Sequence, residues 1–503
     1  MPIKSENYCV SQWIFLRAMG AIYLIAFGSL WVQVEGLMGS HGILPVKDFL
    51  GAVQRQIGPE RYWLVPSLFW VNASDAALHA VCAAGVFFSL FLILGIAPAA
   101  DLFLLWAFYL SLSVVAQDFL SFQWDALLLE AGLLSIFLAP LRIRPQPSDE
   151  PPPSKVILWL LRWLLFRLVF SSGVVKLASH DPMWANLTAL TVHYETQPLP
   201  TWVGWYAHQL PVWFQKISCG GMFAVELGIP FLIFGNQRLR LIAFTLITAF
   251  QLLIMATGNY CFFNLLAIGL CFLLIEDNAW LRLKEAAPFL ISRSWPQGLL
   301  RRFSGNGNVS KRSWPRWITL PLAGVILLVS SVQVMGLFRR DLRPPAVFTE
   351  TSNFLAPLRS INSYGLFAVM TTSRQEIVIE GSQDGATWVP YEFRWKPGDL
   401  RTPPGFVEPH QPRLDWQLWF AALSGPVDNP WFLNLCVRLL QGSPPVLALL
   451  KTNPFPEKPP RAVRAVLYDY RFTDFSIRRA TGQWWRREYK GLYCPPLSLK
   501  GNR

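Results

Sequence analysis

Charged residues are scarce in this chain. Asp, Glu, Lys and Arg make up 15% of its 503 residues, whereas a soluble protein averages about 25%. Apolar residues reach 53% and aromatic residues 14%, with 23 Trp among them. A surface that faces water on all sides needs more charge than this. The composition therefore excludes an ordinary soluble protein and indicates a chain embedded in a bilayer.

Common motifs of catalysis and metal binding are also missing. The seven cysteines form no C-x-x-C pair, and no glycine-rich phosphate loop, nucleophile elbow or H-E-x-x-H helix occurs, which removes the usual signatures of zinc, nucleotide and hydrolase sites. His193 and His208 have no second ligand at helical spacing. We therefore expect no metal and no cofactor. Cys436 and Cys494 remain one candidate disulfide if their region is extracytoplasmic.

The net charge of +13 does not predict a nucleic-acid partner, because much of the excess lies in loops and in the C-terminal third. What the chain does contain is long apolar stretches, and a membrane span needs about 20 such residues. Nine candidates are present, at residues 14–31, 76–96, 102–116, 119–141, 156–175, 221–234, 241–257, 260–275 and 318–338. The third, sixth and eighth are short, and the fourth carries Asp125 and Glu130. The sequence predicts an α-helical polytopic membrane bundle of about nine spans over residues 1–338, with outer loops at 32–75 and 176–220.

Basic residues in one loop predict the orientation of this bundle. The loop 277–316 holds eight of them, namely Arg282, Lys284, Arg293, Arg301, Arg302, Lys311, Arg312 and Arg316. Loops rich in Lys and Arg stay in the cytoplasm. If every intervening span crosses the membrane, the loop 176–220 and residues 339–503 lie together on the opposite side.

The pattern changes after residue 339. Alternating residues at 376–380 and 388–395 flank a turn at 382–385, which predicts a hairpin. A further strand is expected at 463–472, and short helices at 416–423 and 431–441. We predict a small β-rich extracytoplasmic domain over residues 339–503, with Trp388, Trp395, Trp484 and Trp485 as exposed anchors for a partner.

Polar side chains concentrate between two apolar segments, just after the fifth predicted span. The residues concerned are Lys176, Trp184, His193, Tyr194, Glu195, Thr196 and Gln197. An interfacial loop with an aromatic belt would contain such residues. A binding or catalytic surface would contain them as well, since each ionisable group near the membrane must be solvated or paired.

Several strings along the chain carry a resemblance to a known family. They are GILP at 42–45, SFQWDALLLEAG at 121–132, G-x-x-K-L at 173–177, LTALTVHYETQPLPT at 187–201, TGNYCFFN at 257–264 and NSYGLF at 362–367. With these strings the chain resembles the lipase maturation factor family over nearly its whole length. The resemblance implies a cytosolic N-terminus and a chaperone-like role in the maturation of secreted clients, which in the family are lipases assembled in the endoplasmic reticulum.

The resemblance has departures. The chain is compact, ends in LSLKGNR without a retention signal, and lacks a long disordered tail. These features favour a bacterial member in the cell inner membrane, with the C-terminal domain periplasmic rather than lumenal. For such a member a lipase client would be less certain.

Lys176 also supports a rival interpretation. The string G-x-x-K-L followed by Trp184 is similar, over a few residues, to the membrane half of vitamin K-dependent carboxylases, where a lysine acts as a base. Lys176, with His193 and Glu226, would then act on a lipid or quinone-like substrate. This requires desolvation to lower the lysine pKa toward neutrality. The alternative is a lysine that caps the carbonyl end of a helix. A transporter is a third possibility, although no inverted repeat is visible.

Two acids and two arginines lie inside predicted spans and need partners. They are Glu130, Glu226, Arg162 and Arg167. An isolated charge at mid-membrane costs at least ~2.5 kcal/mol, so we expect each acid to pair with an arginine of a neighbouring helix, Arg167 first among them. A polar cavity is the alternative.

Overall fold

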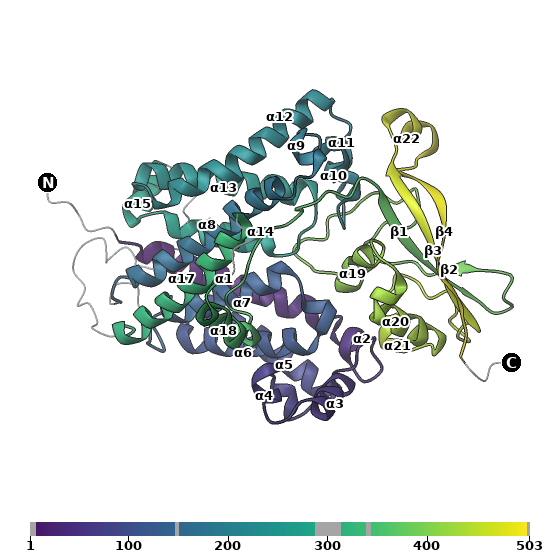
Figure 1. The fold of residues 1–503 in the computed structure, drawn as a ribbon, viewed down its shortest axis with the longest axis horizontal. Helices are drawn as coiled ribbons and strands as arrows, with labels where there is room; N and C mark the ends of the chain where they lie inside the picture. The colour runs from purple at the N-terminus through teal and green to yellow at the C-terminus, as the bar shows by residue number, and fades with distance from the viewer. Residues whose placement is uncertain (1–6, 146–149, 287–312, 339–343, 500–503) are drawn as a thin grey trace.

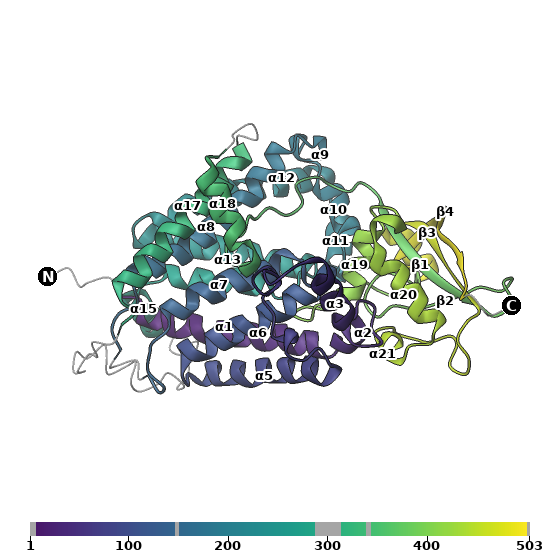
Figure 2. The same ribbon diagram turned by 60° about the horizontal axis from the view of Figure 1, so that its bottom comes forward.

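The computed structural model describes residues 7–145, 150–286, 313–338 and 344–499. Its longest axis runs from a helical bundle at one end to a small sheet at the other (Figure 1). Long helices of the bundle run roughly along this axis, while the sheet and the helices next to it lie at the C-terminal end (Figure 2). The described residues therefore form a helical membrane protein with a small sheet region, as the composition predicts.

Seven helices among the described residues are long and apolar enough to cross a bilayer. They are α1 (Cys9–Trp31), α5 (Asp75–Leu94), α6 (Pro98–Val115), α8 (Lys155–Ala178), the joined helix α12–η3–η4 (Val212–Phe234), α13 (Gln237–Thr257) and α17 (Arg316–Phe338). Each coincides with one of the predicted spans. The joined helix combines α12 (Val212–Phe223), the π-helical turn η3 (Ala224–Gly228) and the 3-10 helix η4 (Ile229–Phe234).

The predicted total of nine spans is not confirmed. The fourth and eighth candidates are α7 (Gln123–Leu138), of 16 residues, and α14 (Phe263–Cys271), of 9 residues, which the 3-residue η5 (Phe272–Leu274) extends. Sixteen helical residues cover about 24 Å, less than the ~30 Å of a hydrocarbon core. Both helices are largely buried among their neighbours, so they lie inside the bundle.

Helix α1 is capped by a residue far away in the sequence. The two carboxylate oxygens of Asp277, the first residue of α15 (Asp277–Ala286), accept the backbone N–H groups of Cys9 and Val10 at 3.2 and 2.9 Å. The first turn of a helix leaves such donors without intrahelical partners. The cap therefore fixes the segment after η5 against the start of α1. Of the predicted cytoplasmic arginines and lysines, Arg293, Arg301, Arg302, Lys311 and Arg312 lie outside the described residues, so the orientation stays a prediction.

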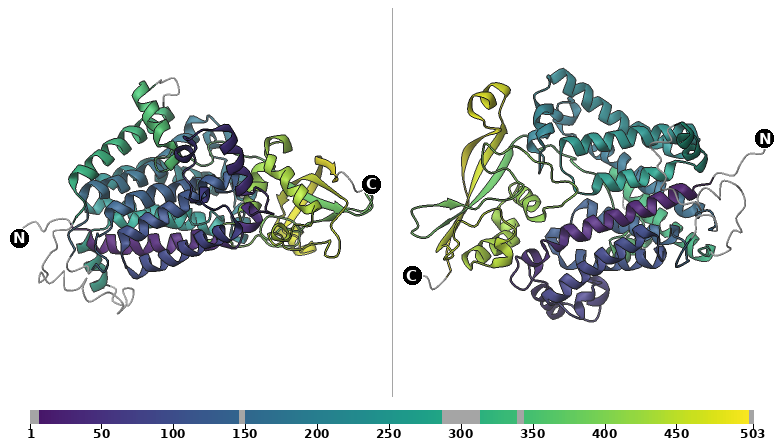
Figure 3. Two further views of the ribbon diagram at one scale, coloured as in Figure 1. Left: turned by 90° about the horizontal axis from the view of Figure 1, so that it is seen from below. Right: turned by 180° about the vertical axis from the view of Figure 1, so that it is seen from behind.

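Both outer loops fold into short helices. The first contains α2 (Val34–Met38), α3 (Val46–Gln56), α4 (Arg61–Leu64) and η1 (Leu68–Trp70), and η2 (Gln117–Leu120) lies beside α7. The second contains α9 (Pro182–Ala185), α10 (Leu190–Thr196) and α11 (Trp202–His208). The Asp181 side chain caps α9 by accepting the Met183 N–H. Segments α9 to α11 lie between the bundle and the sheet (Figure 3).

The C-terminal region holds a four-stranded sheet of order β2-β1-β3-β4. Its strands are β1 (Arg374–Ser382), β2 (Val389–Pro390), β3 (Ala462–Phe472) and β4 (Trp485–Leu497), all antiparallel to their neighbours. The predicted strands at 376–380 and 463–472 are confirmed. The predicted strand at 388–395 is reduced to two residues, because the chain leaves the sheet after Pro390. Strand β4 was not predicted.

Helices cover one side of this sheet and connect it to the bundle. Predicted helices at 416–423 and 431–441 are confirmed as α19 (Arg413–Ala421) and α20 (Pro430–Leu440). The other helical elements of the region are α18 (Ala346–Leu355), η6 (Ala356–Leu358), η7 (Pro426–Asp428), α21 (Pro444–Leu447) and α22 (Phe475–Thr481). Cys436 and Cys494 are both buried free thiols.

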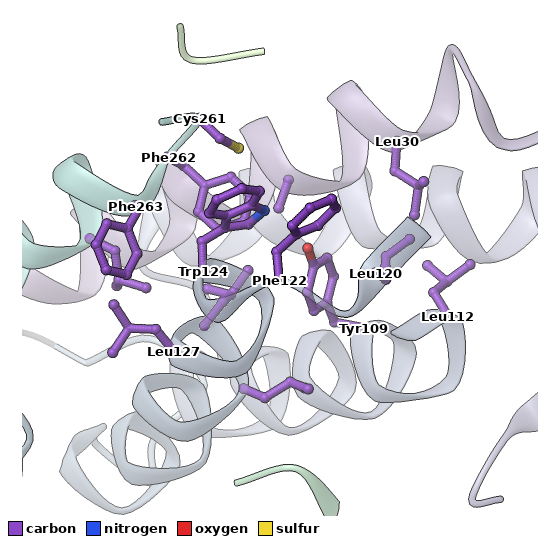
Figure 4. Packing of buried hydrophobic residues seen from close by; sticks show 14 of the residues in the cluster. Leu30, Tyr109, Leu112, Leu120, Phe122, Trp124, Leu127, Cys261, Phe262 and Phe263 are labelled. Carbon is purple, nitrogen blue, oxygen red and sulfur yellow. The ribbon is translucent and has the colours of Figure 1, made fainter. Parts of the chain in front are cut away.

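One hydrophobic core runs through the bundle and the C-terminal helices. Trp124 of α7 stacks on Phe122 at 4.5 Å, and both rings contact Trp416 of α19 at 4.7 and 5.9 Å. Figure 4 shows Phe122 and Trp124 within this cluster, close to Tyr109 and Phe262. These apolar contacts join the C-terminal region to the bundle, in addition to the polar contacts described below.

Candidate functional site: the junction of the bundle and the C-terminal region

Lys176 and Glu226 form a buried ion pair. The Lys176 Nζ donates to both carboxylate oxygens of Glu226 at 2.8 Å and to the Ser172 carbonyl at 3.1 Å, so its three protons all have acceptors. The two side chains are 6% and 7% exposed. Trp184 lies over the ammonium, with its ring centre 5.5 Å from Nζ.

This pairing differs from the prediction that Glu226 binds an arginine. The π-helical turn η3 packs against α8 at the depth of Lys176. Arg167 lies nine residues earlier in α8, which is about 13 Å along the helix. Glu226 therefore pairs with Lys176, the basic residue of α8 that lies at the same depth in the bundle.

Glu130 and Arg167 form a second buried ion pair, between α7 and α8. One oxygen of Glu130 accepts from the guanidinium, and the other accepts the Tyr364 hydroxyl at 2.7 Å and the Asn362 N–H at 3.0 Å. Arg167 also donates to the Asn362 carbonyl at 2.9 Å. The NSYGLF string thus re-enters the bundle after α17 and completes the polar pair that SFQWDALLLEAG begins.

Asp125, at the start of α7, holds the C-terminal region directly. Its two carboxylate oxygens accept both terminal nitrogens of Arg413 at 2.9 and 3.0 Å. Arg413 also donates to the Phe119 carbonyl at 2.6 Å and to the Tyr109 hydroxyl at 3.2 Å. A bidentate, fully buried pair of this kind fixes orientation as well as distance. It ties α19 to the interior of the bundle.

The HYETQP string is bound by a second arginine of the C-terminal region. Arg374, at the start of β1, donates to the backbone carbonyls of Glu195, at 2.9 Å, of Gln197, and of Pro198, at 2.8 Å. Trp419 of α19 donates its indole N–H to the Thr196 carbonyl at 2.8 Å. The string therefore presents its backbone to the C-terminal region.

Two more of the family strings make the same kind of contact. Asn259, in TGNYCFFN, accepts the Val407 N–H at 2.7 Å and donates to the Gly405 carbonyl at 2.9 Å. Gly42, in GILP, accepts from the Arg438 guanidinium at 2.8 Å through its carbonyl. Strings spread over the whole sequence thus meet at one junction.

The loop residues predicted to face a client lie inside this junction. Lys176, Trp184, Thr196 and Gln197 are buried. The Glu195 carboxylate accepts the Phe472 N–H at 2.9 Å, and Tyr194 packs with the cluster of Trp205, Tyr470, Phe472 and Trp485. These positions differ from the prediction because the C-terminal region packs on Trp184 and on residues 194–197. Trp485, predicted to be exposed, is 1% exposed for the same reason. Lys176 is covered by Glu226 and Trp184.

His193 interacts with an aromatic residue rather than with the ion pair. Its Nε2 lies 3.3 Å from the Tyr260 hydroxyl, and its ring meets Phe367 edge-on at 5.1 Å between ring centres. Burial and, to a smaller extent, the positive charge of Lys176 lower the pKa of His193 to about 4. His193 is therefore neutral near neutral pH. The described residues include no cluster of His, Cys, Asp and Glu that could hold a metal ion.

Sequence analysis missed three residues that build the junction: Arg374, Arg413 and Glu408, whose carboxylate accepts the Tyr260 N–H. Each lies in the C-terminal third, which was predicted to lie outside the membrane. A charged residue is ordinary in such a region and gives no sign of a buried partner. Asp125 was the available signal, because a carboxylate within an apolar helix needs a cation somewhere in the fold.

Comparisons with known proteins agree with the motifs that meet at this junction. Residues 10–282 match the model for the lipase maturation factor transmembrane domain, and residues 360–495 match that for the lipase maturation factor C-terminal domain. Lipase maturation factor 2 of Gallus gallus is 38% identical over 97% of this chain and 81% of its own length. For lipase maturation factor 2 of Homo sapiens the values are 37%, 97% and 82%, and for lipase maturation factor 1 of Mus musculus they are 34%, 99% and 89%. No solved structure matches. The chain is a multi-pass membrane protein that belongs to the lipase maturation factor family.

Proposed function

We propose that this chain is a lipase maturation factor that assists the folding and assembly of secreted lipases. The observation that carries the proposal is the match of both family domains over most of the chain, with relatives of that name along nearly its full length. The junction supports it, because buried ion pairs and backbone hydrogen bonds hold the C-terminal region in a fixed position on the bundle. Such an arrangement suits a scaffold that presents a surface.

The surface that we assign to the client lies on the outside of α19 and α20. Five apolar side chains are exposed there between residues 420 and 437, namely Phe420, Leu423, Val427, Leu433 and Val437. Val427 alone is 84% exposed. We call these residues the 420–437 ridge. Exposed apolar groups gathered in one segment are typical of protein-binding sites.

Geometry at Lys176 argues against the enzyme alternative. A general base needs a nitrogen that is free to face its substrate, whereas the Lys176 Nζ is buried and its three hydrogen bonds go to the Glu226 carboxylate and the Ser172 carbonyl. His193 is bound to Tyr260 instead of to Lys176. We therefore assign Lys176 and Glu226 a structural role, with no catalytic residue proposed.

For location, we propose the endoplasmic reticulum membrane, with the C-terminal region on the lumenal side. The support is the set of named relatives, which are vertebrate proteins. A bacterial origin, which would place the chain in a cell inner membrane, stays a prediction.

A secretion assay tests the function. The chain is expressed in cells that lack their own lipase maturation factors, and the activity of a secreted lipase is measured. We expect Val427→Asp combined with Leu433→Asp to reduce lipase activity severalfold with an unchanged amount of folded chain. The matched control is Val389→Asp, which places the same charge at an exposed apolar position of β2. No rescue of lipase activity by the unaltered chain would contradict the proposed function. An equal loss in the control would contradict only the assigned surface.

A further inference from the structure

A cavity of about 360 Å³ lies within the C-terminal region. It lies against β1 and is bordered by the segment from Pro390 to Arg401, with Gln483 and Arg487 also in its lining. Sites for small molecules have volumes of ~300–1,000 Å³. The cavity is thus large enough for a compact ligand, and the family strings do not line it.

Charges around this cavity cancel. Three acids and three bases line it, namely Glu380, Glu392, Asp399, Lys396, Arg401 and Arg487. Glu380 already forms an ion pair with Arg464, with 2.7 Å between Oε2 and Nε. Lys396 forms one with Glu376, with 2.8 Å between Nζ and Oε2. Glu392 and Arg401 have no ion-pair partner among the described residues. A ligand of either net charge would meet groups of its own sign, so the lining favours a neutral one.

An extended peptide is a poor fit, although the cavity reaches the edge of β1. Strand addition needs free backbone groups along that edge. The Ile377 carbonyl already accepts from the Lys396 Nζ at 3.2 Å, and the Ile379 carbonyl accepts the Tyr391 N–H at 2.9 Å. The edge is therefore closed where the cavity touches it.

Hydroxyl groups match the remaining side chains. A hydroxyl both donates and accepts, so adjacent hydroxyls of one ligand can donate to the Glu392 carboxylate and accept from the Arg401 guanidinium. Gln483 offers both roles in a single amide. Pro390 and Leu400 in the lining are at least partly exposed and supply apolar surface for carbon-bound hydrogens. We propose that this cavity is a carbohydrate-binding site for a neutral saccharide of one or two rings.

Titration of the purified full-length chain with neutral disaccharides, such as maltose, lactose and chitobiose, tests the proposal. Isothermal calorimetry and ligand-observed NMR would measure binding. We expect at least one disaccharide to bind, and Glu392→Ala and Arg401→Ala each to weaken its binding about tenfold or more, since hydrogen bonds to charged groups are the strong ones. The matched control, Glu488→Ala, removes an exposed acid of β4 and should leave binding unchanged.

Each other outcome overturns the proposal. Absence of binding by every neutral disaccharide would do so, as would equal binding by all three variants. Tighter binding of a zwitterionic dipeptide such as glycylglycine would assign the balanced charges to a different class of ligand.

Two sources of the saccharide are distinguished by a second comparison. A secreted glycoprotein is tested before and after enzymatic removal of its glycans, with the free disaccharide as competitor. Binding that is lost on deglycosylation and blocked by the sugar indicates a glycan attached to a protein. Binding of the free sugar alone indicates a soluble saccharide. This site does not depend on the proposed maturation role, because direct binding is measured without any lipase activity.

Discussion

Arg413 and Asp125 are 288 residues apart in the sequence and share a buried bidentate ion pair. Arg413 comes from the C-terminal region, and Asp125 begins the interior helix α7. Neither charge has access to bulk water. Each residue therefore requires the other, and the two parts of the chain are mutually dependent in their folding.

Breaking this pair is expected to be costly. Replacing Asp125 by Asn should destabilise the folded protein by about 3–5 kcal/mol, because it leaves the Arg413 guanidinium buried without a counter-charge. The double variant Asp125→Asn, Arg413→Gln should recover part of the loss. Thermal unfolding in detergent micelles measures the cycle. The control is the exposed pair of Glu488 and Lys490, whose replacement should change stability by less than ~1 kcal/mol. Additive losses at Asp125 and Arg413 would refute direct coupling.

Variants of Lys176 and Glu226 can distinguish a structural role of this ion pair from a catalytic one. Lys176→Met should lower both stability and lipase secretion, since Glu226 is left buried and unpaired. Adding Glu226→Leu should restore a large part of both, because two apolar groups replace a matched pair. Lipase secretion and thermal unfolding are measured on the same samples. A well-folded double variant without any activity would revive the enzyme interpretation.

Arg374 is expected to act through its planar geometry. It donates to three backbone carbonyls of the HYETQP string, and lysine has no planar fork of donors with which to do the same. Arg374→Lys keeps the charge and should still expose the string to protease. Limited proteolysis would detect new cleavage near residues 193–198. A cleavage pattern identical to that of the unaltered chain would show that charge alone suffices.

Glu408 gives the junction a dependence on pH. Burial raises the pKa of its carboxyl to about 8, even though the hydrogen bond from the Tyr260 N–H acts in the opposite direction. The folded state then holds a proton that the unfolded state releases above its ordinary value near 4.5. Stability contributed by this residue should be greatest below pH ~4.5 and should fall as the pH rises to about 8.

Glu408→Gln should remove that decline, because the amide does not titrate. Thermal unfolding of the two proteins between pH 6 and pH 9 provides the comparison. The unaltered chain should lose stability with rising pH and the variant should lose less. Parallel curves over this range would exclude Glu408 as the cause.

Membrane orientation can be tested by labelling single cysteines. All seven native cysteines are buried, so they give little background. Cysteines introduced at Ala386, which is exposed in the C-terminal region, and at Ser304, in the predicted cytoplasmic loop, should label from opposite sides of the membrane. Labelling of both positions from the same side would show that the predicted orientation is wrong.

Apolar length was enough to predict the bundle. Runs such as those of α1, α5 and α13 leave few alternatives once a bilayer is assumed. The same criterion wrongly predicted full membrane spans at α7 and α14, because a helix enclosed by other helices is as apolar as one that faces lipid. Alternation predicted β1 and β3, which each bury part of one face. It did not predict β4, an edge strand whose Arg486, Arg487 and Glu488 are all exposed.

The candidate site was predicted in its parts and not in its assembly. The strings that contain Glu130, Lys176 and His193 were singled out, and the structure places all of them near the junction. Their partners Arg374, Arg413 and Tyr364 are distant in sequence, and no local pattern links them. Pairings of this kind depend on tertiary contacts that a single sequence does not display.

The cations that complete the junction have a consequence for biosynthesis. Arg374, Arg413 and Arg438 all follow α17, the last long apolar helix, so they leave the ribosome after every membrane helix has been made. Until Arg413 has been made, Asp125 lies in the forming bundle without its cation. A premature stop codon after α17 would therefore do more than remove the C-terminal region. It would leave a bundle with an unpaired buried carboxylate, and such a product is a substrate for membrane quality control.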